Sequence, residues 1–198
     1  MESLPKDVLV YLALELDLVD IASLCRSNRK IDEKICKNHN FWRNKINRDY
    51  PNKNQYELIE KAIQADSLDL FKFLPKFDNI VQEDAIYYMR LASAYGAKDI
   101  FKYLERYGVN IHQNEEEFFR HASRYGKLNI VRYLVENKGV NINAYHYDAL
   151  IQSTLQGHLD VVKYIVENLK HKIPIKVKRQ ILQFKGLSDG MKEFIAKN

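Results

Sequence analysis

The sequence predicts an all-α protein, in which a three-helix module over residues 1–50 is followed by an α-solenoid of about five helix pairs over residues 51–198. Three observations support this fold class. Glycine (7) and proline (4) are scarce among the 198 residues, so the turn clusters that bound β-strands are few. Similar segments recur every 30 or 31 residues from residue 69 onward. Residues 1–50 do not follow this interval and therefore predict a separate module.

The N-terminal segment LPKDVLVYLALELDLVDIASLCRSN, residues 4–28, predicts two helices. Its leucines and valines follow three- and four-residue spacing, and Asp17 or Asp20 can begin the second helix. A third helix is expected through Ile31 and Ile35, before the segment NFWRNKI. Three short helices bury little apolar surface by themselves, so we expect this module to dock onto a larger body.

The repeated segments predict pairs of helices joined by a glycine turn. The first helix of three pairs is expected to end just before Gly96, Gly126 or Gly157, because glycine favours the left-handed conformation that follows a last helical turn. The second helix carries an apolar stripe that must pack on neighbouring pairs. Its recurring aromatic residue falls at Phe73, Tyr103, Tyr133, Tyr164 and Phe194.

The segments GHLDVVKYIVEN (157–168), GKLNIVRYLVENKGVNINA (126–144) and GAKDIFKYLERYGVNIH (96–112) resemble ankyrin repeats. The period is two to three residues shorter than is usual in that family, so we expect short, degenerate fingers. The resemblance implies repeats at 84–112, 115–143 and 145–171, with capping repeats at 56–82 and 175–198. Arg90 and Arg120, which stand near the family's histidine position, are expected to bond to nearby carbonyls or across repeats.

A second resemblance concerns residues 1–50. The order LPKDVL, LELDLVDIASLCRSNRKI and NHNFWRNKI is similar to the F-box, whose exposed apolar face binds a Skp-type adaptor that is linked to a cullin ubiquitin ligase. The resemblance implies an adaptor-binding set of Leu4, Pro5, Val8, Leu9, Leu12, Leu18, Ile21 and Leu24. An F-box followed by degenerate ankyrin repeats resembles proteins of large DNA viruses, in which case the adaptor would belong to the host.

The ankyrin resemblance also implies a concave surface that binds a target protein. Tyrosine and arginine suit such a surface, because they bury a large area at modest entropic cost. Ordinary packing between repeats is the alternative role for each tyrosine. The residues that would form this surface are Ala94, Tyr95, Gln113, Asn114, Glu116, Arg124, Tyr125, Ala144, Tyr145, Tyr147, Leu155 and Gln156.

The sequence contains none of the common catalytic or phosphate-binding motifs, so we expect no enzyme, no cofactor and no small-molecule substrate. Cys25, Cys36 and His39 suggest a metal site, but a fourth ligand is missing, and we expect no metal. The basic stretch 172–185 contains no acidic residue; a solvated surface is the expectation, with contact to an acidic partner or a nucleic acid as the alternative.

The net charge of +5 indicates a solvated surface of mixed charge rather than a nucleic-acid-binding protein. Acidic residues interrupt the apolar N-terminal stretch, which argues against a signal peptide and a membrane span. Cys25 and Cys36 are expected to form no disulfide framework. Together these features predict an intracellular protein, cytoplasmic, nuclear or both, of a host cell if viral, that is a monomer when free.

Two functions are compatible with the sequence. The first is a non-catalytic substrate receptor of a cullin-type ubiquitin ligase, which binds the adaptor through residues 1–50 and an unidentified target through the ankyrin surface. The alternative is a plain ankyrin-repeat module that sequesters a partner, with N-terminal helices that only cap the solenoid.

Overall fold

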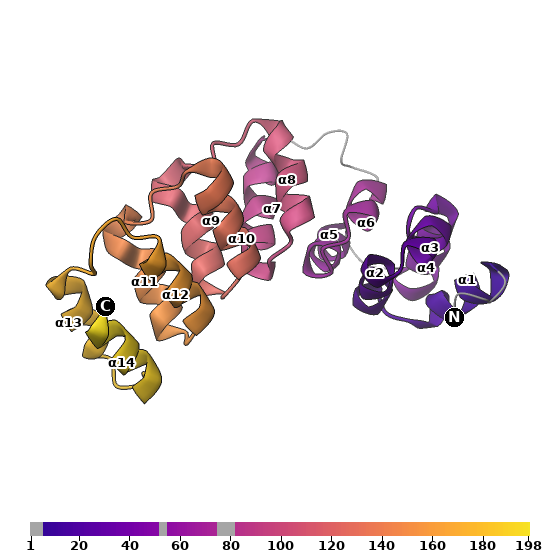
Figure 1. The fold of residues 1–198 in the computed structure, drawn as a ribbon. Helices are drawn as coiled ribbons and strands as arrows, with labels where there is room; N and C mark the ends of the chain where they lie inside the picture. Colours follow the sequence, from indigo (N-terminus) through magenta and orange to yellow (C-terminus); the bar gives the residue numbers. More distant parts are fainter. Residues whose placement is uncertain (1–5, 52–54, 75–81) are drawn as a thin grey trace. The chain divides into compact units, whose positions relative to one another are not determined.

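The computed structural model describes residues 6–51, 55–74 and 82–198. Within these ranges the regular structure is helical and contains no strand, which confirms the all-α fold class (Figure 1). The five expected helix pairs are present, and the chain divides into two compact units. The first unit comprises the residues up to Ala92 together with Asp99–Tyr107, and the second comprises Ser93–Lys98 together with Gly108–Asn198.

The first unit begins with four helical elements that precede the solenoid register. They are α1 (Lys6–Glu15), α2 (Leu18–Ser27), α3 (Arg29–Ile31), which continues into a π-helical turn (Asp32–Cys36), and α4 (His39–Asp49). Helix α2 begins where the sequence allowed, because the Asp17 side chain accepts a hydrogen bond from the Asp20 amide at 2.8 Å. The rest of the unit consists of one complete helix pair and most of a second. The first pair is α5 (Gln55–Gln64) with α6 (Leu68–Phe73), and the second is α7 (Gln82–Tyr95) with α8 (Lys98–Leu104), which ends in a 3-10 turn (Glu105–Tyr107).

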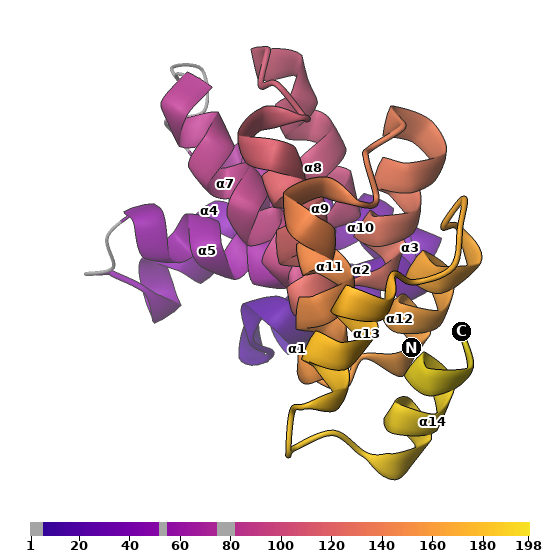
Figure 2. The same cartoon turned by 90° about the vertical axis from the view of Figure 1, so that its left-hand side faces the viewer.

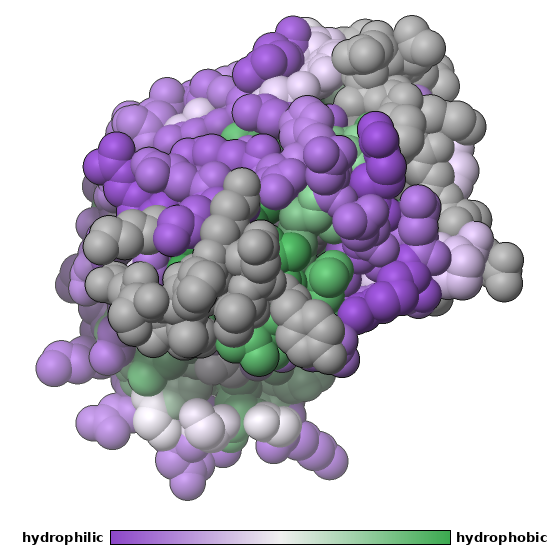
Figure 3. Space-filling model, turned by 90° about the vertical axis from the view of Figure 1, so that its right-hand side faces the viewer, coloured by the Kyte–Doolittle hydropathy of each residue, from purple (hydrophilic) through white to green (hydrophobic). Residues whose placement is uncertain are grey.

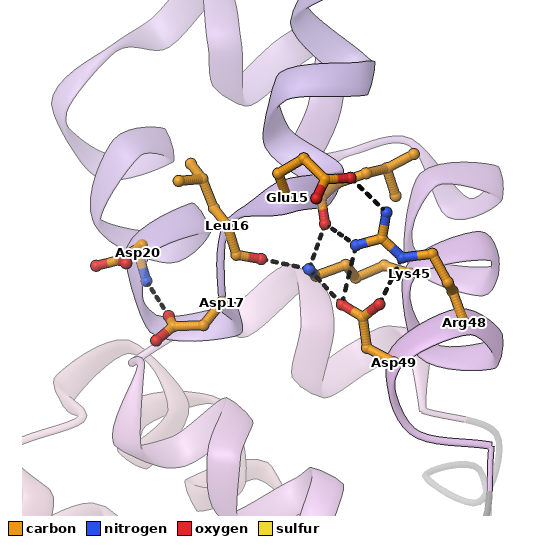
Figure 4. Close-up of polar contacts among 8 residues, drawn as sticks. Glu15, Leu16, Asp17, Asp20, Lys45, Arg48 and Asp49 are labelled. Carbon is orange, nitrogen blue, oxygen red and sulfur yellow. Dashed lines mark hydrogen bonds and ion pairs between the residues drawn. The ribbon is translucent and has the colours of Figure 1, made fainter.

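Helix α4 closes the core of the N-terminal module. Trp42 is fully buried, and its indole N–H donates to the carbonyl of Cys36 at 2.6 Å. Lys45 is also buried, at 2% exposure, and its Nζ donates to the carbonyls of Leu14 and Leu16 at the end of α1 and pairs with Asp49 (Figure 4). A buried ammonium that is paired and bonded to the last carbonyls of a helix fixes where that helix ends.

Cys25 and Cys36 form a disulfide in this structure, with their Cα atoms 6.4 Å apart. The sequence was expected to contain no disulfide framework, and the structure joins its two cysteines in a single disulfide. They are eleven residues apart, and the turn that follows α3 folds the chain back so that the end of α2 lies beside Cys36.

The second unit contains the regular helix pairs. They are α9 (Gln113–Arg124) with α10 (Leu128–Tyr133) and its π-helical extension (Leu134–Lys138), α11 (Ala144–Leu155) with α12 (Leu159–Glu167), and α13 (Ile175–Leu182) with α14 (Asp189–Lys197). Helix α11 packs between α9 and α13, so the pairs stack in chain order (Figures 1 and 2). The first helices end next to Gly126 and Gly157, whose φ values of +69° and +80° confirm the predicted left-handed stops.

Candidate functional site

The N-terminal module presents two exposed apolar side chains, Leu12 on α1 and Val19 on α2, each 43% exposed. Figure 3 shows apolar residues gathered at this end of the chain within a hydrophilic surround. Large apolar side chains at this exposure are common singly, and these two lie on consecutive helices of the N-terminal module. Leu12 was expected from the sequence and Val19 was not.

The other expected adaptor-binding residues lie in three different settings. Leu4 and Pro5 fall outside the described residues, and of Val8 and Leu9 the structure describes only their place in α1. Leu24 is half-buried on α2. Leu18 and Ile21 are buried, at 2% and 0% exposure.

The burial of Leu18 and Ile21 follows from the face of α2 that they share. With Ala22 and Cys25 they form a stripe at three- and four-residue spacing, which turns inward within the first unit, where α2 packs against α5. Both side chains therefore contribute to the core in this structure. A partner could contact them only if α2 moved away from that core, so their role in adaptor binding stays a prediction.

The expected target surface falls entirely in the second unit, on the finger turns and the ends of the first helices. Tyr125 and Tyr145 are 48% and 52% exposed, and Tyr95 is 38% exposed. Asn114, Arg124 and Gln156 are also exposed, whereas Gln113, Tyr147, Ala94 and Leu155 are half-buried. The exposed tyrosines are the members of this set best placed to bury a large area against another protein.

Two members of the expected target set are buried, and we correct their assignment. Ala144 is 9% exposed and Glu116 is 6% exposed. The Glu116 carboxylate lies 2.9 Å from His112 Nδ1 and accepts a hydrogen bond from the Asn141 amide at 3.0 Å. Glu116 therefore joins its own finger to the next one, because a buried carboxylate needs these donors to replace water. Its position in the sequence resembles that of its exposed neighbours, and this bonding could not be recognised there.

Each of two fingers contains a left-handed helical turn built from residues other than glycine. The first turn comprises Asn114, Glu115 and Glu116, with φ of 48°, 54° and 62°, and the second comprises Tyr145, His146 and Tyr147, with φ of 48°, 57° and 65°. A left-handed residue other than glycine costs about 1–2 kcal/mol, so each turn must be held by its surroundings. The Tyr145 amide donates to Glu115 Oε2 at 3.2 Å, which links the two turns.

Arg120 stabilises the first of these turns. Its guanidinium donates to the carbonyls of Asn114 and Glu115 at 2.9 and 3.1 Å, pairs with Asp148 of the next repeat at 3.2 Å, and lies 4.5 Å from the centre of the Tyr145 ring. The expectation that Arg120 bonds to nearby carbonyls and across repeats is confirmed. Arg120 therefore fixes the shape of the finger from which Tyr145 projects.

The recurring tyrosines of the second helices serve packing between repeats. A cation from the preceding repeat lies over each ring: Lys72 over Tyr103 at 5.2 Å, Lys98 over Tyr133 at 5.5 Å and Arg132 over Tyr164 at 5.0 Å. The Tyr164 hydroxyl also donates to Glu136 at 3.0 Å, and burial together with this carboxylate raises the pKa of Tyr164. These tyrosines were not among the expected target-binding residues, and they agree with the packing expected of the second helices.

The basic stretch lies on α13 and the turn after it. Ile175 is 74% exposed and Phe184 is 49% exposed, among the lysines and arginine of residues 172–185. Lys178 donates to the carbonyl of Ala196 at 3.4 Å. The choice between a solvated surface and a contact surface for an acidic partner stays open at this position.

The comparisons with known proteins identify one region. The sequence model of the family Ankyrin repeats (3 copies) matches residues 89–178. The matched region is similar to ankyrin repeats, which indicates a module for protein–protein interaction. No curated protein and no solved structure matches the chain. Among the described residues, no helix is long and apolar enough to cross a membrane.

Proposed function

We propose that this chain is a non-catalytic substrate receptor of a cullin-type ubiquitin ligase. The N-terminal module binds a Skp-type adaptor, and the ankyrin-repeat region binds the protein to be ubiquitinated. The observation that carries the proposal is the exposure of Leu12 and Val19, at 43% each, on consecutive helices of the module that resembles the F-box. An apolar pair left outside the core is the feature that an adaptor-binding face requires.

The module supports this role because its stability does not depend on the exposed pair. Trp42 and Phe41 are buried at 0% and 2% exposure, and Lys45 ties the end of α1 to α4. Leu12 and Val19 are therefore free to contribute to binding rather than to folding. Each apolar side chain that a partner buries in full contributes about 1.5–3 kcal/mol.

The ankyrin region contributes the target surface. Tyr95, Tyr125 and Tyr145 expose their rings, and the finger that carries Tyr145 is fixed by Arg120. Rigid aromatic side chains lose little conformational entropy on binding, which favours affinity for a folded protein surface. The identity of the target is set by these exposed side chains.

The test mixes the purified chain with a eukaryotic Skp-type adaptor and measures their co-elution by size-exclusion chromatography with light scattering. We expect a one-to-one complex that is lost in the double variant Leu12→Asp with Val19→Asp and in the double variant Leu4→Ala with Pro5→Ala. Ile175→Asp, which changes the most exposed apolar side chain of the second unit, is the matched control and should leave the complex intact. Circular dichroism shows whether each variant is folded.

The alternative function is sequestration of a partner by the ankyrin region alone, with N-terminal helices that only cap the solenoid. The burial of Leu18 and Ile21, on the face of α2 that packs toward α5, favours this alternative. A folded wild-type chain that forms no complex with the adaptor would refute the receptor proposal and support the cap. Loss of the fold in the Leu12 and Val19 variant would equally favour the cap.

A further inference from the structure

Three potential metal-ligand atoms converge in the first unit. The sulfur atoms of Cys25 and Cys36 and a carboxylate oxygen of Asp32 lie within 4.8 Å of one another. Cys25 lies in the last turns of α2, and Asp32 and Cys36 begin and end the π-helical turn. The cysteines are buried, at 8% and 3% exposure. Helix α2 thus supplies one sulfur atom, and the π-helical turn supplies the other sulfur atom and the carboxylate.

A cavity of about 380 Å³ gives access to these atoms and has an acidic wall. Asp66, Asp69 and Asp99 line it beside the cysteines and Asp32. Burial, with Asp99 nearby, raises the pKa of Asp66 to about 6, and burial, with Asp32 nearby, raises the pKa of Asp69. The aspartates that line the cavity beside the cysteines give it an acidic wall, which attracts a cation.

The cavity also contains two arginines, which would oppose a cation if their charges pointed into it. Arg26 donates to the carbonyl of Ala65, and Arg29 pairs with Glu33 at 3.2 Å. Both guanidinium groups are therefore engaged with acceptors outside the group of three ligands. They reduce the negative potential of the cavity without occupying the position between the sulfur atoms and Asp32.

We propose that Cys25, Asp32 and Cys36 bind one Zn²⁺ ion when the disulfide is reduced. Zinc binds thiolate sulfur at about 2.3 Å and carboxylate oxygen at about 2.0–2.2 Å in a tetrahedral arrangement. Two thiolates on one such ion lie about 3.8 Å apart, a spacing that side-chain rotation provides when the Cα atoms are 6.4 Å apart. Water from the cavity supplies the fourth ligand.

The reaction balances with a thiol reductant. Two thiol molecules give two electrons and two protons to the Cys25–Cys36 disulfide and become a disulfide themselves. Zinc then displaces the two protons, because only the thiolate binds the metal. Oxidation by a disulfide reverses the sequence, reforms the Cys25–Cys36 bond and releases the ion.

The neighbouring side chains fit this assignment. Lys37 pairs with Asp32 Oδ2 at 3.0 Å, which orients the carboxylate and partly balances the net negative charge of two thiolates and one carboxylate around a divalent ion. His39, the ligand that the sequence suggested beside Cys36, packs its ring against Phe73 with centroids 5.5 Å apart. Asp32, rather than His39, is therefore the third ligand.

The experiment uses the full chain, reduced and freed of reductant without oxygen, and titrated with Co²⁺ as the spectroscopic probe for Zn²⁺. We expect one Co²⁺ per chain with a thiolate-to-cobalt charge-transfer band that Zn²⁺ abolishes. The band should be absent from Cys25→Ser and Cys36→Ser. Asp32→Asn should weaken Co²⁺ binding by roughly tenfold or more, and Asp69→Asn, which lines the same cavity but is outside the ligand group, should weaken it much less.

Several outcomes would overturn the proposal. They are a reduced chain without the band, a band that survives either serine substitution, an equal loss of affinity in Asp32→Asn and Asp69→Asn, and an oxidised chain that gives the same band. If circular dichroism shows that a serine variant does not fold, the proposal is tested by the Co²⁺ affinities of the two aspartate variants and by the absence of the band in the oxidised wild-type chain. None of these readouts depends on adaptor binding, so this proposal and the proposed function can fail separately.

Discussion

Replacing Gly126 by alanine tests how one repeat is attached to the next. Gly126 follows α9 with φ of +69°, and a Cβ atom built at this position would lie 2.5 Å from Nδ1 and 2.7 Å from Cγ of His158. Real Cβ atoms do not approach other atoms so closely, so the imidazole ring must move. That ring donates from Nε2 to the carbonyl of Arg124 at 3.0 Å, and the hydrogen bond is lost when it moves.

The expected cost has two parts. A left-handed residue with a Cβ costs about 1–2 kcal/mol, and the lost hydrogen bond between repeats costs about 0.5–1.5 kcal/mol. The reduced entropy of the unfolded chain with alanine offsets about 0.4–1 kcal/mol. Gly126→Ala should therefore lower the free energy of unfolding by about 0.5–3 kcal/mol.

Gly157→Ala is the matched control. Gly157 has φ of +80°, and a Cβ atom there would meet nothing within 4 Å. This variant pays only the conformational cost, so it should be more stable than Gly126→Ala by about 0.5–1.5 kcal/mol. The double variant Gly126→Ala with His158→Ala should be more stable than the sum of its single effects predicts, because the ring is already gone.

Urea unfolding followed by circular dichroism measures these differences from the midpoint and slope of each transition. Equal destabilisation by Gly126→Ala and Gly157→Ala would refute the reasoning, since both would then report backbone strain alone. Additive effects in the double variant would likewise show that His158 does not contact the new methyl group.

Three further predictions concern residues that the structure places in defined contacts. Arg120→Lys should destabilise the second unit by about 1–3 kcal/mol in urea unfolding, because the single ammonium lacks the planar fork with which Arg120 reaches two carbonyls and Asp148 at once. Asp66→Asn should be more stable than the wild-type chain at pH 7, and the difference should disappear below pH 4. Burial raises the pKa of Asp66 in the folded chain to about 6, above its ordinary value of 3.8, so the wild-type chain loses stability as pH rises between these values. A wild-type free energy of unfolding that does not fall over this pH range would contradict the prediction. Tyr164→Phe should cost about 0.5–1.5 kcal/mol through the lost hydrogen bond to Glu136, and it should cost less when Glu136→Gln has already replaced the charged acceptor by a neutral one, which a double-mutant cycle measures.

The helix pairs could be predicted from the sequence because their causes are local. An apolar stripe at helical spacing and a glycine in the left-handed region act within one repeat, and the thirty-residue interval shows the same causes several times over. The bonding of Arg120 to carbonyls could be anticipated for the same reason. These features can be recognised without knowing which part of the protein, or which partner, a side chain contacts.

The parts that could not be predicted depend on contacts between distant residues. The burial of Leu18 and Ile21 depends on the packing of α2 within the first unit, and an apolar stripe by itself does not state whether it faces its own core or a partner. The pairing of Cys25 with Cys36 depends on a π-helical turn. The left-handed turns consist of residues with no special preference for positive φ, apart from Asn114, so only the structure reveals them.

The two left-handed turns explain how the ankyrin region can expose large aromatic side chains and still keep a fixed shape. Glu116 and Arg120 provide the hydrogen bonds that hold the first turn, and Glu115 links it to the second. Tyr145, which is 52% exposed, projects from this supported backbone. The residues that hold the first turn, Arg120 and Glu116, are not the tyrosine that is exposed. We therefore expect a substitution of the exposed tyrosine to change target binding while the turns keep their conformation. A substitution of Arg120 or Glu116 should change both the conformation of the turns and target binding.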